Sequence, residues 1–290
     1  MRDNTVTMVK QATLRDAIAW PARLPVLPAV LRAGYALLMK RAFGVLQRRA
    51  VVDVAGVGLM QLEPWDMIDS RIYFFDVWEP AVSRFMRDRV KPGAVVADIG
   101  ANIGYYTLLL SRAVGPTGHV YAIEPSPQIR LRLEDALTRN AVTNVTIVPY
   151  GISDRTERRA FTISAANLGA SHFGEPSEDG LELRRLADVI PADQLARLSF
   201  IKIDVEGMEG AVMRDIATLL PALPQELTLC AELRMNAELR AILEDFRKAG
   251  MSSLHLPNRY SMFDYPAHPT APEPCDAPGD GQIDLALVRN

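Results

Sequence analysis

The sequence predicts an α/β fold with a mostly parallel sheet and helices on both faces, because short apolar segments alternate with segments of helical periodicity. Several of the apolar segments end in an acidic residue, and the first is followed at once by a glycine-containing turn. The expected strands are Val95–Ile99, Val120–Glu124, Val145–Val148, Phe200–Asp204, Leu227–Glu232 and Ile283–Val288. The expected helices are Leu108–Ala113, Pro127–Asn140, Glu209–Leu220 and Ala237–Ala249.

The turn after the first expected strand predicts a site for a nucleoside-carrying cofactor. Gly100 and Gly104 lack a Cβ and tolerate positive φ, so a ligand can approach the backbone there. A dinucleotide fingerprint has a third, middle glycine, whereas this chain has Asn102, and Asp98 precedes the turn. A carboxylate repels a pyrophosphate but accepts a hydrogen bond from an ammonium group. We therefore expect S-adenosylmethionine rather than NAD.

A second cofactor contact is expected at Glu124, which ends the next strand and can accept hydrogen bonds from both ribose hydroxyls. The alternative for Asp98 and for Glu124 is that each caps the helix after it. The adenine is expected against the segment after the third strand, beside Gly151 and Ile152. The full set of expected cofactor contacts is Asp98, Gly100, Asn102, Gly104, Tyr106, Thr107, Glu124, Pro125, Gly151 and Ile152.

Three segments together resemble the FkbM family of S-adenosylmethionine-dependent methyltransferases. They are Asp98–Thr107, Ile123–Pro125 and Ile201–Glu209, and the last, I-K-I-D-V-E-G-M-E, is the most specific. Trp78-Glu79-Pro80 also resembles the W-E-P of that family, so the resemblance spans roughly residues 53–232. It implies a Rossmann-like class I methyltransferase fold, with a seven-stranded sheet whose last strand is antiparallel.

Two of the three candidate catalytic residues lie at or just after the end of the strand Phe200–Asp204. Asp204 is expected to face the methyl group, and Glu206 lies two residues later, where a helix N-terminal charge is the alternative role. His172 lies in a segment that resembles the N-x-G-x-S segment of the family, with an exposed loop histidine as the alternative. An alcohol acceptor needs a general base or a divalent metal. Asp204, Glu206 and Glu232 are the candidate Mg²⁺ ligands.

The resemblance implies O-methylation of a hydroxyl on a sugar, a glycolipid or a secondary metabolite. A nitrogen or carboxylate acceptor, a non-catalytic partner-binding protein and a nicotinamide-dependent oxidoreductase are the alternatives. The net charge of -3 does not indicate the basic surface that binds nucleic acid, so we expect no nucleic acid as a partner. The two cysteines, Cys230 and Cys275, lie far apart in the sequence and suggest neither a disulfide framework nor a zinc site. This cysteine content fits a protein of the reducing cytoplasm.

Residues 1–50 form an expected helical extension in front of a methyltransferase domain at residues 51–290. The segment Ala17–Val52 contains no acid, and six basic residues alternate with apolar ones, so a basic amphipathic helix is expected from about Pro28. Residues 23–49 are expected to lie on a membrane surface, on the domain or on a second subunit. The N-terminus lacks the pattern of a signal peptide, and no apolar run is long enough to span a bilayer. We therefore expect a cytoplasmic protein with or without peripheral membrane contact.

The proline-rich segment Pro257–Gly281 is expected to be a long loop or a lid.

Overall fold

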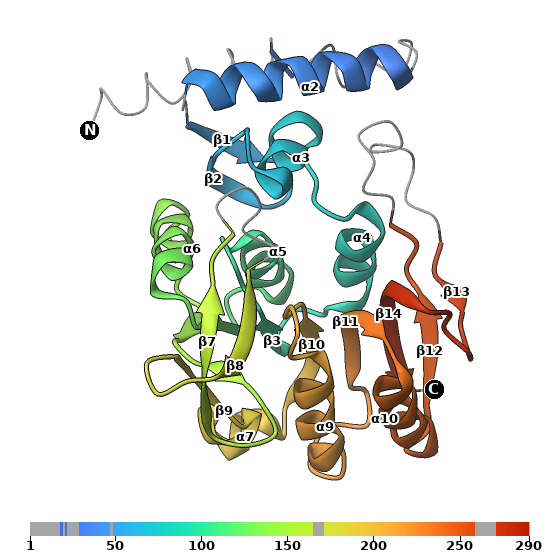
Figure 1. The fold of residues 1–290 in the computed structure, drawn as a ribbon. Coiled ribbons are helices and arrows are strands. Elements are labelled where there is room, and N and C mark those ends of the chain that lie inside the picture. Colours follow the sequence, from blue (N-terminus) through green and yellow to red (C-terminus); the bar gives the residue numbers. More distant parts are fainter. Residues whose placement is uncertain are drawn as a thin grey trace.

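A central eight-stranded sheet organises the computed structural model, which describes residues 18–19, 21, 29–46, 49–164, 171–258 and 271–289. The strand order is β13-β12-β14-β11-β10-β3-β4-β5 (Figure 1). The bounds are β3 (Val95–Ile99), β4 (His119–Ile123), β5 (Val145–Val148), β10 (Leu198–Ile203), β11 (Thr228–Met235), β12 (Met251–His255), β13 (Glu273–Pro274) and β14 (Gly281–Arg289). The direction of strand succession reverses between β3 and β10, which is where ligands bind in open α/β sheets.

The sheet confirms the predicted Rossmann-like fold class. β3, β4, β5, β10 and β11 are parallel, and β14 is antiparallel to both β11 and β12. The six located strands match observed strands, but the seventh, β12, was not located because Met-Ser-Ser-Leu-His is neither an apolar run nor an alternating one. An eighth strand of two residues, β13, lies inside the expected loop Pro257–Gly281, of which residues 259–270 are outside the described chain.

Helices cover both faces of the sheet and create two cores. Alternation along β3 assigns Val96 to one core and Val95 and Ala97 to the other. The first core includes side chains of α4 (Pro80–Arg89), α5 (Tyr105–Val114) and α6 (Pro127–Arg139). The second includes side chains of α7 (Leu186–Val189), α8 (Ala192–Leu195), α9 (Glu209–Leu219) and α10 (Ala237–Lys248).

Capping side chains explain where the helices after the strand ends begin. Ser126 accepts a hydrogen bond from the backbone N–H of Ile129, and Pro127 occupies the first position of α6, where it costs no hydrogen bond. Asn236 likewise caps α10 by accepting from the N–H of Leu239. The strand tips and the helix starts are therefore held at fixed positions around the switch point.

A second, four-stranded sheet in the order β6-β9-β7-β8 follows β5. Its strands are β6 (Gly151–Ile152), β7 (Glu157–Thr162), β8 (His172–Pro176) and β9 (Leu181–Arg184). The sequence suggested a strand pair within Arg155–Ile163, which is wrong in part, because only β7 lies there. Its partners β8 and β9 come from beyond residue 170.

An N-terminal layer lies at one end of the molecule (Figure 1). Helix α2 (Ala29–Leu46) confirms the expected helix and lies outside the hairpin β1 (Ala50–Val54) and β2 (Gly58–Leu62) and helix α3 (Met67–Phe75). Ala33 and Ala36 of α2 belong to the same core as β1, β2 and α3. None of the helices in the described ranges combines the length and the apolarity that a membrane span needs. The boundary at residue 50 stays a prediction.

Candidate functional site

Asp98 is fully buried in β3 and keeps one carboxylate oxygen for a ligand. The hydroxyl of Thr107 donates to its Oδ2 at 2.6 Å, while Oδ1 has no hydrogen-bond partner within the described chain. Burial raises the pKa of Asp98, and the ammonium of Lys202, 3.9 Å from Oδ1, opposes that rise. Since a buried polar atom without a hydrogen bond is costly, Oδ1 is suited to an incoming donor such as an ammonium group.

The two glycines of the turn serve packing between chain segments, which differs from the reason given by the sequence. Gly100 has a φ of 83°, and a Cβ there would lie 1.8 Å from the backbone oxygen of Asp204. Gly104 has a φ of 90°, and its Cβ would lie 2.8 Å from the side chain of Leu133. Gly100 therefore lets the β3 turn touch the end of β10, and Gly104 lets α5 approach α6.

Glu124 lies just after β4 and is bound by two backbone N–H groups. Asn102 donates to its Oε2 at 3.0 Å, and Ser126 donates to its Oε1 at 2.9 Å. Burial raises the pKa of Glu124 to about 7 against the opposing effect of these two bonds. Each carboxylate oxygen retains a second lone pair, so the expected contact with ribose hydroxyls is still available.

A hollow at the strand tips brings together a large part of the predicted site. Its lining includes the predicted residues Gly100, Asn102, Glu124, Pro125, Asp204 and Glu206. The sequence did not assign the rest of the lining, which is Ile129, Phe161, Ser171, Phe173 and Val205. Phe161 of β7 and Phe173 of β8 meet edge to face, with ring centroids 4.9 Å apart. The second sheet thus supplies an apolar wall to this hollow.

The remaining predicted cofactor contacts lie behind this lining. Tyr106 is buried and its hydroxyl donates to Oε2 of Glu79 at 2.5 Å. Gly151 and Ile152 form β6, and a Cβ on Gly151 would lie 3.1 Å from the ring of Phe173. Asp98, Gly104, Tyr106, Thr107, Gly151 and Ile152 are therefore absent from the lining, and their contact with a cofactor stays a prediction.

Lys202 is a buried cation that links the two sides of the switch point. Its ammonium donates to Oδ2 of Asp204 at 2.9 Å and lies 4.7 Å from the ring centre of Tyr106. Burial alone lowers the pKa of Lys202, but the carboxylates of Asp204 and Asp98 raise it above the ordinary value. Lys202 is therefore the buried partner of Asp204.

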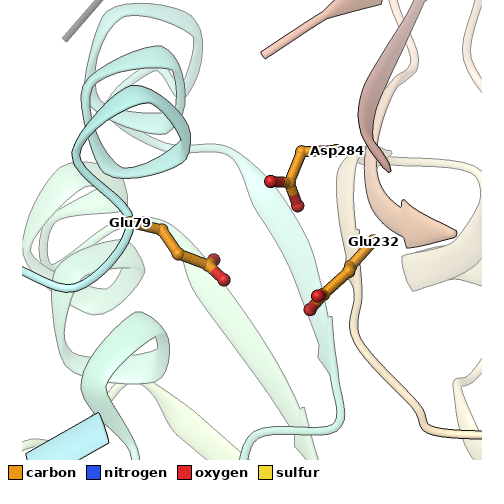
Figure 2. Close-up of side chains that lie close together, drawn as sticks. All are labelled: Glu79, Glu232 and Asp284. Atoms are coloured by element: carbon orange, nitrogen blue, oxygen red, sulfur yellow. The ribbon is translucent and has the colours of Figure 1, made fainter. Parts of the chain in front are cut away.

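Three carboxylates from distant segments lie together beside Lys202 (Figure 2). Glu79 precedes α4, Glu232 lies in β11 and Asp284 lies in β14, with one oxygen of each within 4.8 Å of the others. The β11–β14 register places Glu232 directly opposite Asp284, an unfavourable arrangement for two like charges. This acid trio is the one group of three potential metal ligands found in the described part of the chain.

The acid trio is crowded but hydrogen-bonded. Asn258 donates to Oδ2 of Asp284 at 2.8 Å, and Gln282 donates to Oε1 of Glu232. Burial raises the pKa of Glu79 to about 8, with further contributions from Asp284 and Asp204. Burial and the same neighbours raise the pKa of Glu232 to about 11. Part of this group therefore holds protons at neutral pH.

The predicted magnesium ligands coincide with the acid trio only at Glu232. Asp204 and Glu206 instead share a small second hollow with Glu232, together with Glu209 and Arg234. Arg234 lies 3.6 Å from Glu206. Burial and Asp204 raise the pKa of Glu206, while Arg234 and His172 lower it. His172, exposed at the start of β8, is thus close enough to Glu206 to act on its charge.

The two aspartates beside Lys202 outnumber its single positive charge. Asp204 and Asp98 both raise the pKa of Lys202, whereas Glu79 and Glu232 add negative charge only when they lose their protons. Such a site attracts a cation and repels a diphosphate. S-adenosylmethionine, with its sulfonium and ammonium groups, therefore fits these residues better than NAD does.

The profile of the methyltransferase FkbM domain matches residues 98–247, more than half of the chain. The chain belongs to the FkbM methyltransferase family. It has the class I methyltransferase fold. The match begins at Asp98 and includes Glu124, Asp204 and Glu206.

Relatives of this FkbM-type chain are matched over less than two thirds of their length. AMB antimetabolite synthetase AmbE of Pseudomonas aeruginosa is 32% identical over 163 residues, 42% of this chain and 8% of that protein. Methyltransferase sdnD of Sordaria araneosa is 27% identical over 156 residues, 42% of this chain and 60% of that protein. Among solved structures, methyltransferase FkbM of Methylobacillus flagellatus is 17% identical with a TM-score of 0.44, covering 97% of this chain and 60% of that one.

Proposed function

We propose that this FkbM-type methyltransferase transfers the methyl group of S-adenosylmethionine to a hydroxyl of a small molecule, a sugar or a glycolipid. The observation that carries the proposal is the placement of Asp204 and Glu206 in the lining of the same hollow as Glu124, next to buried Asp98. The cofactor supplies an electrophilic methyl group, so the protein has to align the acceptor and to remove its proton.

Two carboxylates at the strand ends offer one acceptor for each polar part of S-adenosylmethionine, one within the lining of the hollow, Glu124, and one buried outside it, Asp98. Oδ1 of Asp98 would accept from the ammonium group, and Glu124 would accept from the ribose hydroxyls. Phe161 and Phe173 would pack against the apolar face of the adenine. This assignment uses an oxygen that is otherwise left unbonded at the end of β3.

On the acceptor side, Asp204 would orient the hydroxyl and Glu206, two residues later, would act as the base. Asp204 is fixed by Lys202, so its second oxygen can orient an incoming hydroxyl at the tip of β10. Glu206 would take the proton, because its raised pKa makes the carboxylate a stronger base than an ordinary glutamate. His172 would influence the charge of Glu206 from the edge of the site.

Calorimetric titration with S-adenosylmethionine, S-adenosylhomocysteine and NAD tests the cofactor assignment. We expect binding of the first two ligands, and about tenfold weaker binding in Glu124→Gln, because one charge-assisted contact contributes roughly 1.5 kcal/mol. Binding of NAD alone would contradict the proposal.

Transfer of labelled methyl groups to a panel of polyols, glycans and glycolipids tests the acceptor class. With an alcohol acceptor, we expect Glu206→Gln to lower kcat by about 100-fold or more and to leave cofactor binding unchanged. Methylation of amines or carboxylates with unchanged kcat in Glu206→Gln would favour the alternative acceptors. A rate unaffected by EDTA would exclude the predicted magnesium ion from the reaction.

A further inference from the structure

Helix α2 presents an apolar stripe to the outside of the protein. The side chains of Val30, Leu31, Leu37 and Leu38 are 67%, 59%, 42% and 66% exposed. They make up all but one of the large hydrophobic side chains exposed in the described ranges, and the exception is Leu131 of α6, at 66%. Isolated exposed apolar residues are ordinary, but four on one helix form a patch.

The spacing of these residues places them on one side of α2. Leu31, Leu37 and Leu38 follow Val30 by one, seven and eight residues, and with 3.6 residues per turn these positions share one face of a helix. Gly34 and the exposed Arg41 lie on the same face. Ala33 and Ala36 lie on the opposite side and are buried against the rest of the protein. Helix α2 lies at the outer end of the molecule (Figure 1). It is packed through its alanine face, and its leucine face is exposed.

The charge of this segment indicates which surface would cover the stripe. No acidic residue occurs from Ala17 to Val52, and the segment contains six basic residues. Arg41 is exposed on the stripe itself, whereas Lys40 is half-buried and Arg49 pairs with Glu63. An apolar stripe within a cationic, acid-free segment is complementary to the anionic headgroups and acyl boundary of a bilayer. We propose that α2 docks this protein on an anionic membrane surface, with the four apolar side chains inserted at the headgroup level.

A second copy of the chain fits the stripe less well. An 18-residue helix is about 27 Å long and about 10 Å wide, so one face offers roughly 270 Å². A stable protein interface buries about 800 Å² on each partner. Two facing copies would also bring two basic segments together, without an acid in either segment to pair with the other's charges. The membrane proposal does not rest on the proposed acceptor, because it concerns binding alone.

Vesicle flotation of the full chain tests this inference. We expect binding to vesicles of phosphatidylcholine and phosphatidylglycerol, weaker binding to phosphatidylcholine alone, and loss of binding at high salt. Leu38→Glu should weaken binding by about tenfold or more, because it removes an inserted side chain and adds a repelled charge. Leu131→Glu is the matched control, with the same exposed fraction on another helix, and should bind as the wild type does.

Three outcomes would overturn the inference. The first is a wild-type chain that fails to float with anionic vesicles, and the second is an equal loss in Leu38→Glu and Leu131→Glu. The third is a dimer in solution that Leu38→Glu dissociates, which would assign the stripe to a second copy. Both variants lie at exposed positions, and circular dichroism with thermal melting confirms that they fold.

Discussion

The two sides of the switch point hold their carboxylates in different ways. On the β3–β4 side, Asp98 and Glu124 are bound by groups within nine and twenty-two residues along the chain. On the β10–β14 side, the acid trio comes from segments far apart, and Asp284 raises the pKa of both Glu79 and Glu232. In the first arrangement, Asp98 and Glu124 and the groups bound to them form a fixed set of acceptors, the cradle, to which we assign the cofactor. The second arrangement groups carboxyl groups with raised pKa values close to the proposed acceptor side.

The comparison depends most on Gly100, where the β3 turn touches the end of β10. Gly100→Ala should lower the free energy of unfolding by about 4 kcal/mol, because its Cβ would overlap the Asp204 carbonyl oxygen and its φ is positive. Gly250→Ala is the control, since Gly250 has nearly the same φ, 82°, but no atom within 4 Å of an added Cβ, and should cost about 1 kcal/mol. Urea denaturation measures both values. Equal losses would mean that the two sides do not meet at Gly100.

A second test removes the cation that the two sides share. Lys202→Met should destabilise the protein by about 3 kcal/mol at neutral pH, because it leaves Asp98 and Asp204 without their buried counter-charge. The loss should shrink at acidic pH, where these carboxylates accept protons. Thermal melting across pH provides the measurement, and a loss that is independent of pH would indicate lost packing instead of lost charge.

The smallest expected effect concerns Glu79 and has a defined sign. Its pKa rises from an ordinary 4.5 to about 8 on folding, so the folded state binds more protons between these values. This contribution to stability is full below about pH 4.5 and is lost as the pH rises toward about 8. Glu79→Gln should therefore gain about 1 kcal/mol relative to wild type between about pH 5 and pH 6. Melting curves at both pH values would show a constant difference if the carboxyl were not protonated on folding.

The same contrast explains how far the sequence predicts this molecule. Apolar runs and helical periodicity identify the strands around Asp98 and Asp204 and four helices, because each depends on local sequence. The cofactor turn is equally local. The acid trio depends on the register of β11 against β14 and on the path of the chain before α4, and neither is encoded in a short window. Phe173 is missed for a similar reason, because β8 pairs with β7 across a long connection.

The most direct measurement is calorimetric binding of S-adenosylmethionine to wild type, Asp98→Asn and Asp284→Asn. Asp98 and Asp284 are both buried aspartates, but only Asp98 belongs to the cradle. The account predicts about 100-fold weaker binding in Asp98→Asn, since a buried charge-assisted contact contributes roughly 3 kcal/mol, and less than about threefold change in Asp284→Asn. Unchanged affinity in folded Asp98→Asn, or an equal loss in both variants, would contradict the assignment of the cofactor to the β3–β4 side.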